Sequence, residues 1–438
     1  MTAAPPELDA GQEAARKSAR LALALLGFVY LLMGAYIEPP LPIGDGWILP
    51  SFATVLALPV LLLVMLGTLR RRDIVLLASV AGLLLVSAVL SPGLEWIREK
   101  VLGLAQTLVA MVGGLLLFKL AEFLPVPVLR RVLAVGWVLL LVAATLEVVG
   151  VLRPAVVAFG EAVYHTGGYQ FYSADLRDIE LLGFARPKVF TSEPSLVAIA
   201  FYVLLTGWLA LRVTLLRLLV AIAAATVMLS LVGSPVLLIA VPVLCLIYAR
   251  LGPRDMLTLA LAVVVVAGAV LLLPLLIPGV VERLAERLDA AVTNAATLAP
   301  TSENLRLVIP AVTTVDVLTA SPLLGVGISG KEVMGQFSAL PGVDFAGDTQ
   351  FGNAFALFLC YLGLAGAALF VGILRRWLRE SGVRYGGLCT VVVIGLSQAM
   401  GGFETPRFWA YIFLVLAVYR AASPSPAEGA SPTGASGS

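Results

Sequence analysis

The stretch Arg186-Pro-Lys-Val-Phe-Thr-Ser-Glu193-Pro-Ser195 marks the point at which a polar loop ends and a long apolar run begins. Proline is favoured in the first turn of a helix, so Pro194 predicts a helix start here. Glu193 then lies at or beside the N-cap, where the positive end of the helix dipole favours a carboxylate. The apolar run that follows, about residues 194–212, is long enough to cross a bilayer. The stretch therefore predicts a charged loop at a membrane surface, followed directly by a membrane helix.

Similar apolar runs recur along the whole sequence. Hydrophobic residues make up 60% of the chain and charged residues 13%, whereas charged residues form roughly one quarter of a soluble domain. Membrane spans are predicted at about 20–37, 48–69, 73–91, 101–123, 131–152, 194–212, 214–232, 235–250, 255–277, 352–374, 383–400 and 407–421. The expected fold class is therefore all-α, a polytopic membrane protein with about 12 transmembrane helices.

The charges and loops suggest one transmembrane domain. It is expected over residues 20–421, between a cytoplasmic lead (1–19) and a disordered cytoplasmic tail (422–438). Most of the 29 lysines and arginines fall in short segments on one side of the predicted spans, and the positive-inside rule places that side in the cytoplasm. The two long loops, 153–193 and 279–351, are then extracytoplasmic.

The second long loop is expected to contain helices of its own. Residues 282–298 carry leucine and alanine at helical spacing with charges on the other face, as in a helix lying in the membrane interface. Residues 303–319 are also periodic, but Arg306 and Asp316 would make a simple span costly. We expect a re-entrant or interfacial helix there, with a kink at Pro310.

The sequence offers little that would bind a metal. It contains one histidine, and each of its three cysteines lies in an apolar run without a C-x-x-C pair (Cys245, Cys360 and Cys389). This pattern argues against a disulfide framework, a zinc site or a redox motif. No cofactor is therefore expected. The net charge of +2 says little about partners, because the charges are confined to loops.

The charged residues around the first stretch allow two interpretations. Glu193 either marks a plain helix start, paired with Arg186 or Lys188, or is a carboxylate poised to take a proton or hold a sugar hydroxyl. Cations at the outer face commonly contact lipid headgroups, but arginine also suits bidentate binding of phosphate or diphosphate. Arg306 is the stronger phosphate candidate, because a cation on an apolar helix needs a partner.

Four other features have simpler explanations. Asn353 is interpreted first as a helix cap, Arg407 as the salt-bridge partner of Glu404, and Trp409 as an anchor at the membrane interface. The segment Ser321-Pro-Leu-Leu-Gly-Val-Gly327 lacks a phosphate-loop pattern. Its glycines predict a tight turn with close backbone approach.

Together these motifs resemble the O-antigen polymerase and ligase superfamily, which includes Wzy-type polysaccharide polymerases and WaaL-type O-antigen ligases. Arg306, followed by the 321–327 turn, resembles the arginine-bearing helix and "PLLGVG" turn of the family's large outer loop. Asn353-Ala-Phe-Ala-Leu357 and Gly363-Leu-Ala-Gly366 resemble the "HN-x-x-L … G-L-x-G" start of the next span. Ser192-Glu-Pro-Ser195 resembles the "EPS" element of many exopolysaccharide polymerases. The resemblance covers roughly residues 186–374.

The resemblance implies a GT-C-like bundle that transfers a glycan from a polyprenyl-diphosphate carrier at the outer face of the bacterial inner membrane. The Glu193-Pro-Ser195 element favours polymerisation of lipid-linked repeat units into O-antigen or exopolysaccharide. Gly352 stands where the ligases carry a functional histidine, which argues against a ligase. Arg186 and Arg306 would then bind the diphosphate and stabilise the leaving group. Glu193 would be the general base on the acceptor hydroxyl, or its orienter. The substrate-binding residues expected are Lys188, Asn353, Arg407, Tyr172 and Asn304.

The expected partners are a polyprenyl-diphosphate-linked oligosaccharide, membrane lipid and a chain-length regulator, and no nucleic acid. Three alternatives stay open: an O-antigen ligase acting on a lipid A-core acceptor, another lipid-linked glycosyltransferase, and a transporter or flippase. A transporter predicts polar or broken helices at the bilayer midplane. Here charge within the spans is scarce, with Glu147 the closest case, and polar residues gather in the two outer loops. This distribution favours chemistry at the surface.

Overall fold

The computed structural model is helical apart from one pair of two-residue strands, β1 (Leu41–Pro42) and β2 (Ile48–Leu49), in the part of the chain that it describes. The expected all-α class is confirmed. The residues described are 10–39, 41–42, 48–49, 52–93, 95, 97–164, 175–234, 236–251, 308–328, 331–337, 353–383 and 386–422.

Each predicted span except 255–277, which lies outside the described residues, coincides with an apolar helix. These helices are α1 (Ala10–Ile37), α2 (Phe52–Met65), α3 (Arg71–Leu90), α4 (Ile97–Phe123), α5 (Val126–Val148), α8 (Pro194–Ala210), α9 (Leu215–Val232), α10 (Val236–Leu251), α15 (Ala354–Glu380), α16 (Gly386–Ala399) and α17 (Pro406–Ala421). Within the described chain, 6 helices are long and apolar enough to cross a membrane. The protein is therefore a multi-pass membrane protein, while the total of 12 spans stays a prediction.

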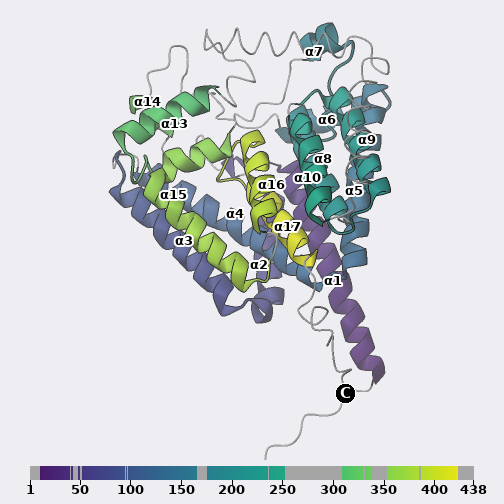
Figure 1. The fold of residues 1–438 in the computed structure, drawn as a ribbon, viewed down its shortest axis with the longest axis horizontal. Coiled ribbons are helices and arrows are strands. Elements are labelled where there is room, and N and C mark those ends of the chain that lie inside the picture. The colour runs from purple at the N-terminus through teal and green to yellow at the C-terminus, as the bar shows by residue number, and fades with distance from the viewer. Residues whose placement is uncertain are drawn as a thin grey trace, which may run out of the picture.

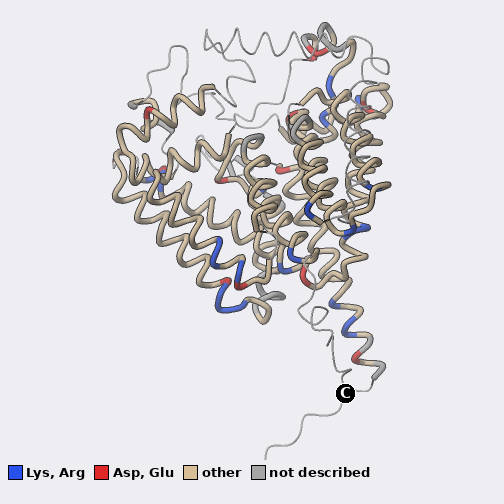
Figure 2. The backbone as a smooth tube through the Cα atoms, in the orientation of Figure 1, with Lys and Arg blue, Asp and Glu red and all other residues tan. Residues whose placement is uncertain are grey.

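Shorter helices gather at one end of the bundle. They are α6 (Arg153–Tyr164), α7 (Asp175–Leu182), α13 (Ile309–Ala320) and α14 (Lys331–Phe337). The N-terminal end of α1 lies at the opposite end (Figure 1). Many lysines and arginines lie near that opposite end (Figure 2), which is the distribution that the positive-inside rule expects of a cytoplasmic face.

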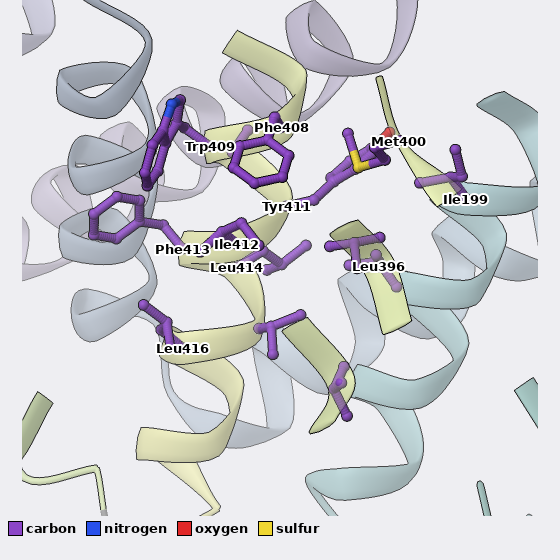
Figure 3. Packing of buried hydrophobic residues seen from close by; sticks show 14 of the residues in the cluster. Ile199, Leu396, Met400, Phe408, Trp409, Tyr411, Ile412, Phe413, Leu414 and Leu416 are labelled. Atoms are coloured by element: carbon purple, nitrogen blue, oxygen red, sulfur yellow. The ribbon is translucent and has the colours of Figure 1, made fainter. Parts of the chain in front are cut away.

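Helix α17 forms the centre of the bundle, where every residue from 406 to 419 is buried. It packs most extensively against α4, and a Cβ atom on Gly114 of α4 would lie 2.7 Å from the carbonyl oxygen of Trp409. Trp409 and Phe413 point to one side of α17, whereas Tyr411 and Leu414 point to the other (Figure 3).

Trp409 is therefore a core residue, and its predicted role as an interface anchor was wrong. It is 2% exposed, and its indole nitrogen donates to the Phe403 carbonyl at 2.9 Å. The surrounding helices bury it, and its position near the start of a span could not reveal them.

Helix α15 is broken at Gly363, which has φ 61° and ψ −172°. The predicted turn at 321–327 fits into this break: Val326 N donates to Cys360 O at 2.8 Å, and Leu364 N donates to Pro322 O at 2.8 Å. A Cβ atom on Gly325 would lie 2.1 Å from the Cys360 oxygen. The close backbone approach predicted for this turn is confirmed, and the turn supplies partners for backbone groups that the break leaves open.

Pro310 lies in the first turn of α13. Residues 303–307, which precede it in the predicted helix, lie outside the described residues, so the kink at Pro310 stays a prediction. The interfacial helix predicted over 282–298 lies outside the described residues.

Candidate functional site

Glu193 is the N-cap residue of α8, with φ −143° and ψ 148°, and Pro194 occupies the first turn. The predicted helix start is confirmed. The Glu193 side chain makes no capping hydrogen bond; instead the Ser195 hydroxyl donates to its Oε2 at 2.7 Å. The carboxylate is thus oriented by a side chain of its own helix, beside the positive end of the α8 dipole.

The two cations that precede Glu193 form ion pairs with α7. Arg186 Nε lies 3.0 Å from Asp178 Oδ2, and Lys188 Nζ lies 3.3 Å from Asp175 Oδ1. The Lys188 side chain is 2% exposed, and this burial lowers its pKa while Asp175 acts in the opposite direction. The sequence analysis named Glu193 as the simple partner of these cations and missed both aspartates.

Arg153, at the start of α6, completes this charged cluster. Its guanidinium contacts Asp175 and lies 3.5 Å from a Glu147 oxygen. Arg153, Arg186 and Lys188 thus face Glu147, Asp175 and Asp178. Because opposite charges are close to balanced, the cluster is stable without a ligand, and a phosphate group would have to compete with carboxylates for the cations.

Glu147, at the end of α5, organises the backbone of the loop. One of its oxygens accepts from Val189 N at 2.7 Å, and both lie 3.0 Å from Lys188 N. Its side chain is 0% exposed. The sequence showed this residue as a rare charge near the end of an apolar helix, which is a reason to expect a function. Its partners, 41 and 42 residues further along the chain, could not be read from the sequence.

Arg407 is paired with Glu38, a residue just beyond the end of α1, at 3.0 Å. Its Nε donates to Ala35 O at 2.9 Å and its Nη2 to Tyr36 O at 3.1 Å. The sequence analysis had named Glu404 as the partner. The structure shows that Arg407 joins the first turn of α17 to the last turn of α1, and its side chain is 6% exposed.

Asn353 is the N-cap of α15, and its side chain accepts from Ala356 N at 3.0 Å. It is 4% exposed. The interpretation of Asn353 as a helix cap is confirmed, and its role in substrate binding stays a prediction.

Three of the predicted site residues, Arg306, Tyr172 and Asn304, lie outside the described residues. The expected convergence of Arg186 and Arg306 on one diphosphate is therefore untested. Helix α13, which follows Arg306 in the sequence, lies at the same end of the bundle as α6 and α7 (Figure 1).

The comparison with protein families gives one match. Residues 218–371 match a family described as O-antigen ligase. The match covers about a third of the chain and agrees with the resemblance of the sequence to the O-antigen polymerase and ligase superfamily. The matched residues contain the 321–327 turn and the break at Gly363, so the two features that fit together in space are also part of the superfamily's region. A comparison with curated proteins finds no match.

The family match confirms the resemblance seen in the sequence and supports a role in glycan assembly, as a polymerase or a ligase. Arg186, Lys188 and Glu193 precede the first matched residue. What they do is therefore argued from their geometry, and not from the match.

Proposed function

We propose that the protein polymerises polyprenyl-diphosphate-linked oligosaccharide repeat units into O-antigen or exopolysaccharide at the outer face of the inner membrane. The acceptor hydroxyl attacks the donor anomeric carbon, the bond from that carbon to the phosphate oxygen breaks, and the lipid diphosphate leaves. One observation carries the proposal. The Glu193 carboxylate lies at the N-terminus of an apolar helix and is oriented by Ser195.

Glu193 acts as the general base in this reaction and accepts the proton of the acceptor hydroxyl as the new bond forms. Two features suit it to that role. Its carboxylate lies at the N-terminus of an apolar helix, and a carboxylate oxygen can accept a proton. The hydrogen bond from Ser195 fixes its rotamer, so little conformational freedom is lost when the acceptor binds.

Arg186, Lys188 and Arg306 bind the donor diphosphate and stabilise the charge that develops on it. Donor binding exchanges the ion pairs of Arg186 and Lys188 with α7 for contacts to phosphate. Asp175 keeps a cation in this exchange, because Arg153 contacts the same carboxylate. The exchange therefore leaves no uncompensated charge at Asp175, which would be the costly outcome.

A ligase is the second candidate, and the description of the matching family favours it. Gly352 favours the polymerase, since the ligases of this superfamily carry a functional histidine there. The break in α15 is a feature that a transporter would also show. Here the 321–327 turn closes the break with backbone hydrogen bonds, which supports a structural role for it.

The experiment uses the purified full chain with lipid-linked repeat units, and the products are separated by size. A ladder of products is the expected result. Addition of a single unit to a lipid A-core acceptor would indicate a ligase, and movement of the lipid without a product would indicate a flippase. Glu193→Gln and Arg306→Ala should abolish the ladder, whereas Glu161→Gln, which removes an exposed acid of α6, should not. A wild-type ladder from Glu193→Gln would refute the proposed role of the carboxylate.

A further inference from the structure

Three non-glycine residues of the described chain have a left-handed backbone: Glu38 (φ 49°), Val189 (φ 40°) and Phe190 (φ 65°). This region is unfavourable for residues with a Cβ atom, and most of all for a β-branched residue such as valine. Val189 and Phe190 follow one another in the loop that leads to Glu193. Such strain persists only where the surroundings over-determine the backbone, and it is concentrated at functional sites.

Three helices hold the strained turn from different sides. Glu147 of α5 accepts from Val189 N at 2.7 Å. The Tyr36 hydroxyl of α1 donates to Val189 O at 2.7 Å, and the Tyr164 hydroxyl of α6 lies 2.9 Å from Phe190 O. All three holding side chains are buried. Both polar backbone groups of Val189 are therefore bound by side chains that cannot turn to water.

A second set of contacts fixes the end of α1, and with it Tyr36. Arg407 donates to the carbonyl oxygens of Ala35 and Tyr36 and is paired with Glu38. Glu38 itself has a left-handed backbone. The strained residues at the end of α1 and in the turn thus belong to one hydrogen-bonded network that extends from α17 through α1 to the loop before α8.

The turn is connected rigidly to Glu193. The Thr191 hydroxyl lies 2.6 Å from Lys188 O and 2.8 Å from Glu193 O. The Phe190 ring packs against Phe159 of α6 with 5.3 Å between ring centroids. A relaxation of the backbone at Val189 would therefore move Glu193 as well.

We infer that Glu147 and Tyr36 are positioning residues, which hold the Val189–Phe190 turn in its strained conformation and thereby set the position of the Glu193 carboxylate. This inference rests on the proposed function of Glu193. Glycine at Val189 would adopt the same φ without strain, but it would also reach many other conformations. Valine at position 189, with a buried side chain and a turn held from three sides, keeps the backbone in one conformation. The general base Glu193 needs this single conformation in order to meet its substrate at hydrogen-bonding distance.

The test compares Val189→Gly and Tyr36→Phe with wild type in the laddering assay, and it measures kcat, donor KM and melting temperature. Val189→Gly relieves the strain but also removes a buried side chain, so its melting temperature should fall, and kcat of the folded protein should drop by about tenfold or more because Glu193 is less well placed. Tyr36→Phe keeps the ring and removes one hydrogen bond, and kcat should drop by about threefold to tenfold. Donor KM should change by less than about twofold in both, since the cations are retained. Val151→Gly, at an exposed valine, is the matched control and should behave as wild type.

Two results would overturn the inference. One is a wild-type kcat in both variants. The other is a loss of activity in both that is fully accounted for by the fraction of protein unfolded at the assay temperature, which would indicate a purely structural role. Glu193→Gln, measured in parallel, distinguishes failure of the positioning role from failure of the proposed function. If Glu193→Gln is inactive while Val189→Gly and Tyr36→Phe turn over normally, the proposed function stands and the positioning role fails. If Glu193→Gln forms a wild-type ladder, the proposed function itself fails.

Discussion

Two fully buried carboxylates, Asp73 and Glu147, bind very different partners. Asp73 accepts from Lys119 Nζ at 2.7 Å and from the Trp377 indole nitrogen at 2.9 Å, and so joins the helices α3, α4 and α15. Glu147 accepts mainly from backbone N–H groups of an irregular loop. The same chemical group thus connects helix to helix at one site and determines a loop conformation at the other.

We therefore expect Asp73 to contribute mainly to the stability of the protein and Glu147 mainly to its function. Removing Asp73 should affect how well the bundle holds together, because it joins its own helix α3 to α4 and α15. Removing Glu147 should affect where the loop before α8 lies, because its partners are the backbone atoms of Lys188 and Val189.

The largest expected effect is the loss of stability in Asp73→Ala. This change leaves Lys119 buried, with Glu122 at 3.6 Å as the remaining acid, and removal of one partner of a buried ion pair costs about 3–5 kcal/mol. Unfolding of the purified protein in detergent, followed by circular dichroism, measures the effect. The kcat of the fraction that stays folded should be unchanged. A selective loss of kcat would show that Asp73 is not merely structural.

Glu147→Gln should show the opposite pattern. The amide keeps the size of the side chain but accepts with one oxygen only, so the Lys188 and Val189 N–H groups compete for it. We expect kcat to fall by about 100-fold, and stability to fall by about 1–3 kcal/mol. Steady-state laddering rates and melting curves from the same preparation decide between the two patterns. If stability falls as far as in Asp73→Ala while kcat is kept, the contrast between the two carboxylates is wrong.

The sequence predicts those features of the fold and of the site that depend on a single segment of the chain. Pro194 predicts the start of α8, and the glycines at 325 and 327 predict a tight turn, because a proline or a glycine restricts or frees the backbone of its own segment. The apolar runs predict the helices for the same reason, since each needs only its own length and composition.

The contacts that build the site are not local. Arg407 binds Tyr36, which is 371 residues away, and no spacing rule connects the start of the last span to the end of the first. Asp175 and Asp178 lie on a short helix that contains no apolar run from which it could be predicted. The strain at Val189 is likewise invisible, because neither valine nor phenylalanine indicates a left-handed backbone. Identifying Glu193 as a candidate was possible from the sequence, whereas identifying what holds it required the structure.

The pH dependence of donor KM at high pH tests the proposed role of Lys188 in diphosphate binding. Burial lowers the pKa of Lys188 below that of an ordinary lysine, so its charge is lost at a lower pH than usual. If Lys188 binds the diphosphate, donor KM should rise by about tenfold per pH unit above that pKa. Lys188→Arg should abolish this rise, because a guanidinium stays charged.

The same shift predicts a trend in stability. The unfolded chain binds more protons than the folded protein between the lowered pKa and the ordinary lysine value, so stability should rise with pH in that window. A KM that rises equally in wild type and Lys188→Arg would assign the alkaline limb to a different group.

A third carboxylate, Glu380, is exposed, and we expect its removal to have the smallest effect of the three. Glu380, in the last turn of α15, pairs with Arg376 at 2.9 Å, but the two side chains are 43% and 72% exposed. Exposed pairs at i and i+4 contribute about 0.3–0.5 kcal/mol, so Glu380→Gln should leave both the melting temperature and kcat close to wild type. A stability loss near that of Asp73→Ala would mean that ion pairing itself, and not burial, determines the effect. Together, the three variants separate the effect of burial from that of loop geometry, since only Glu147 combines a buried carboxylate with a strained backbone partner.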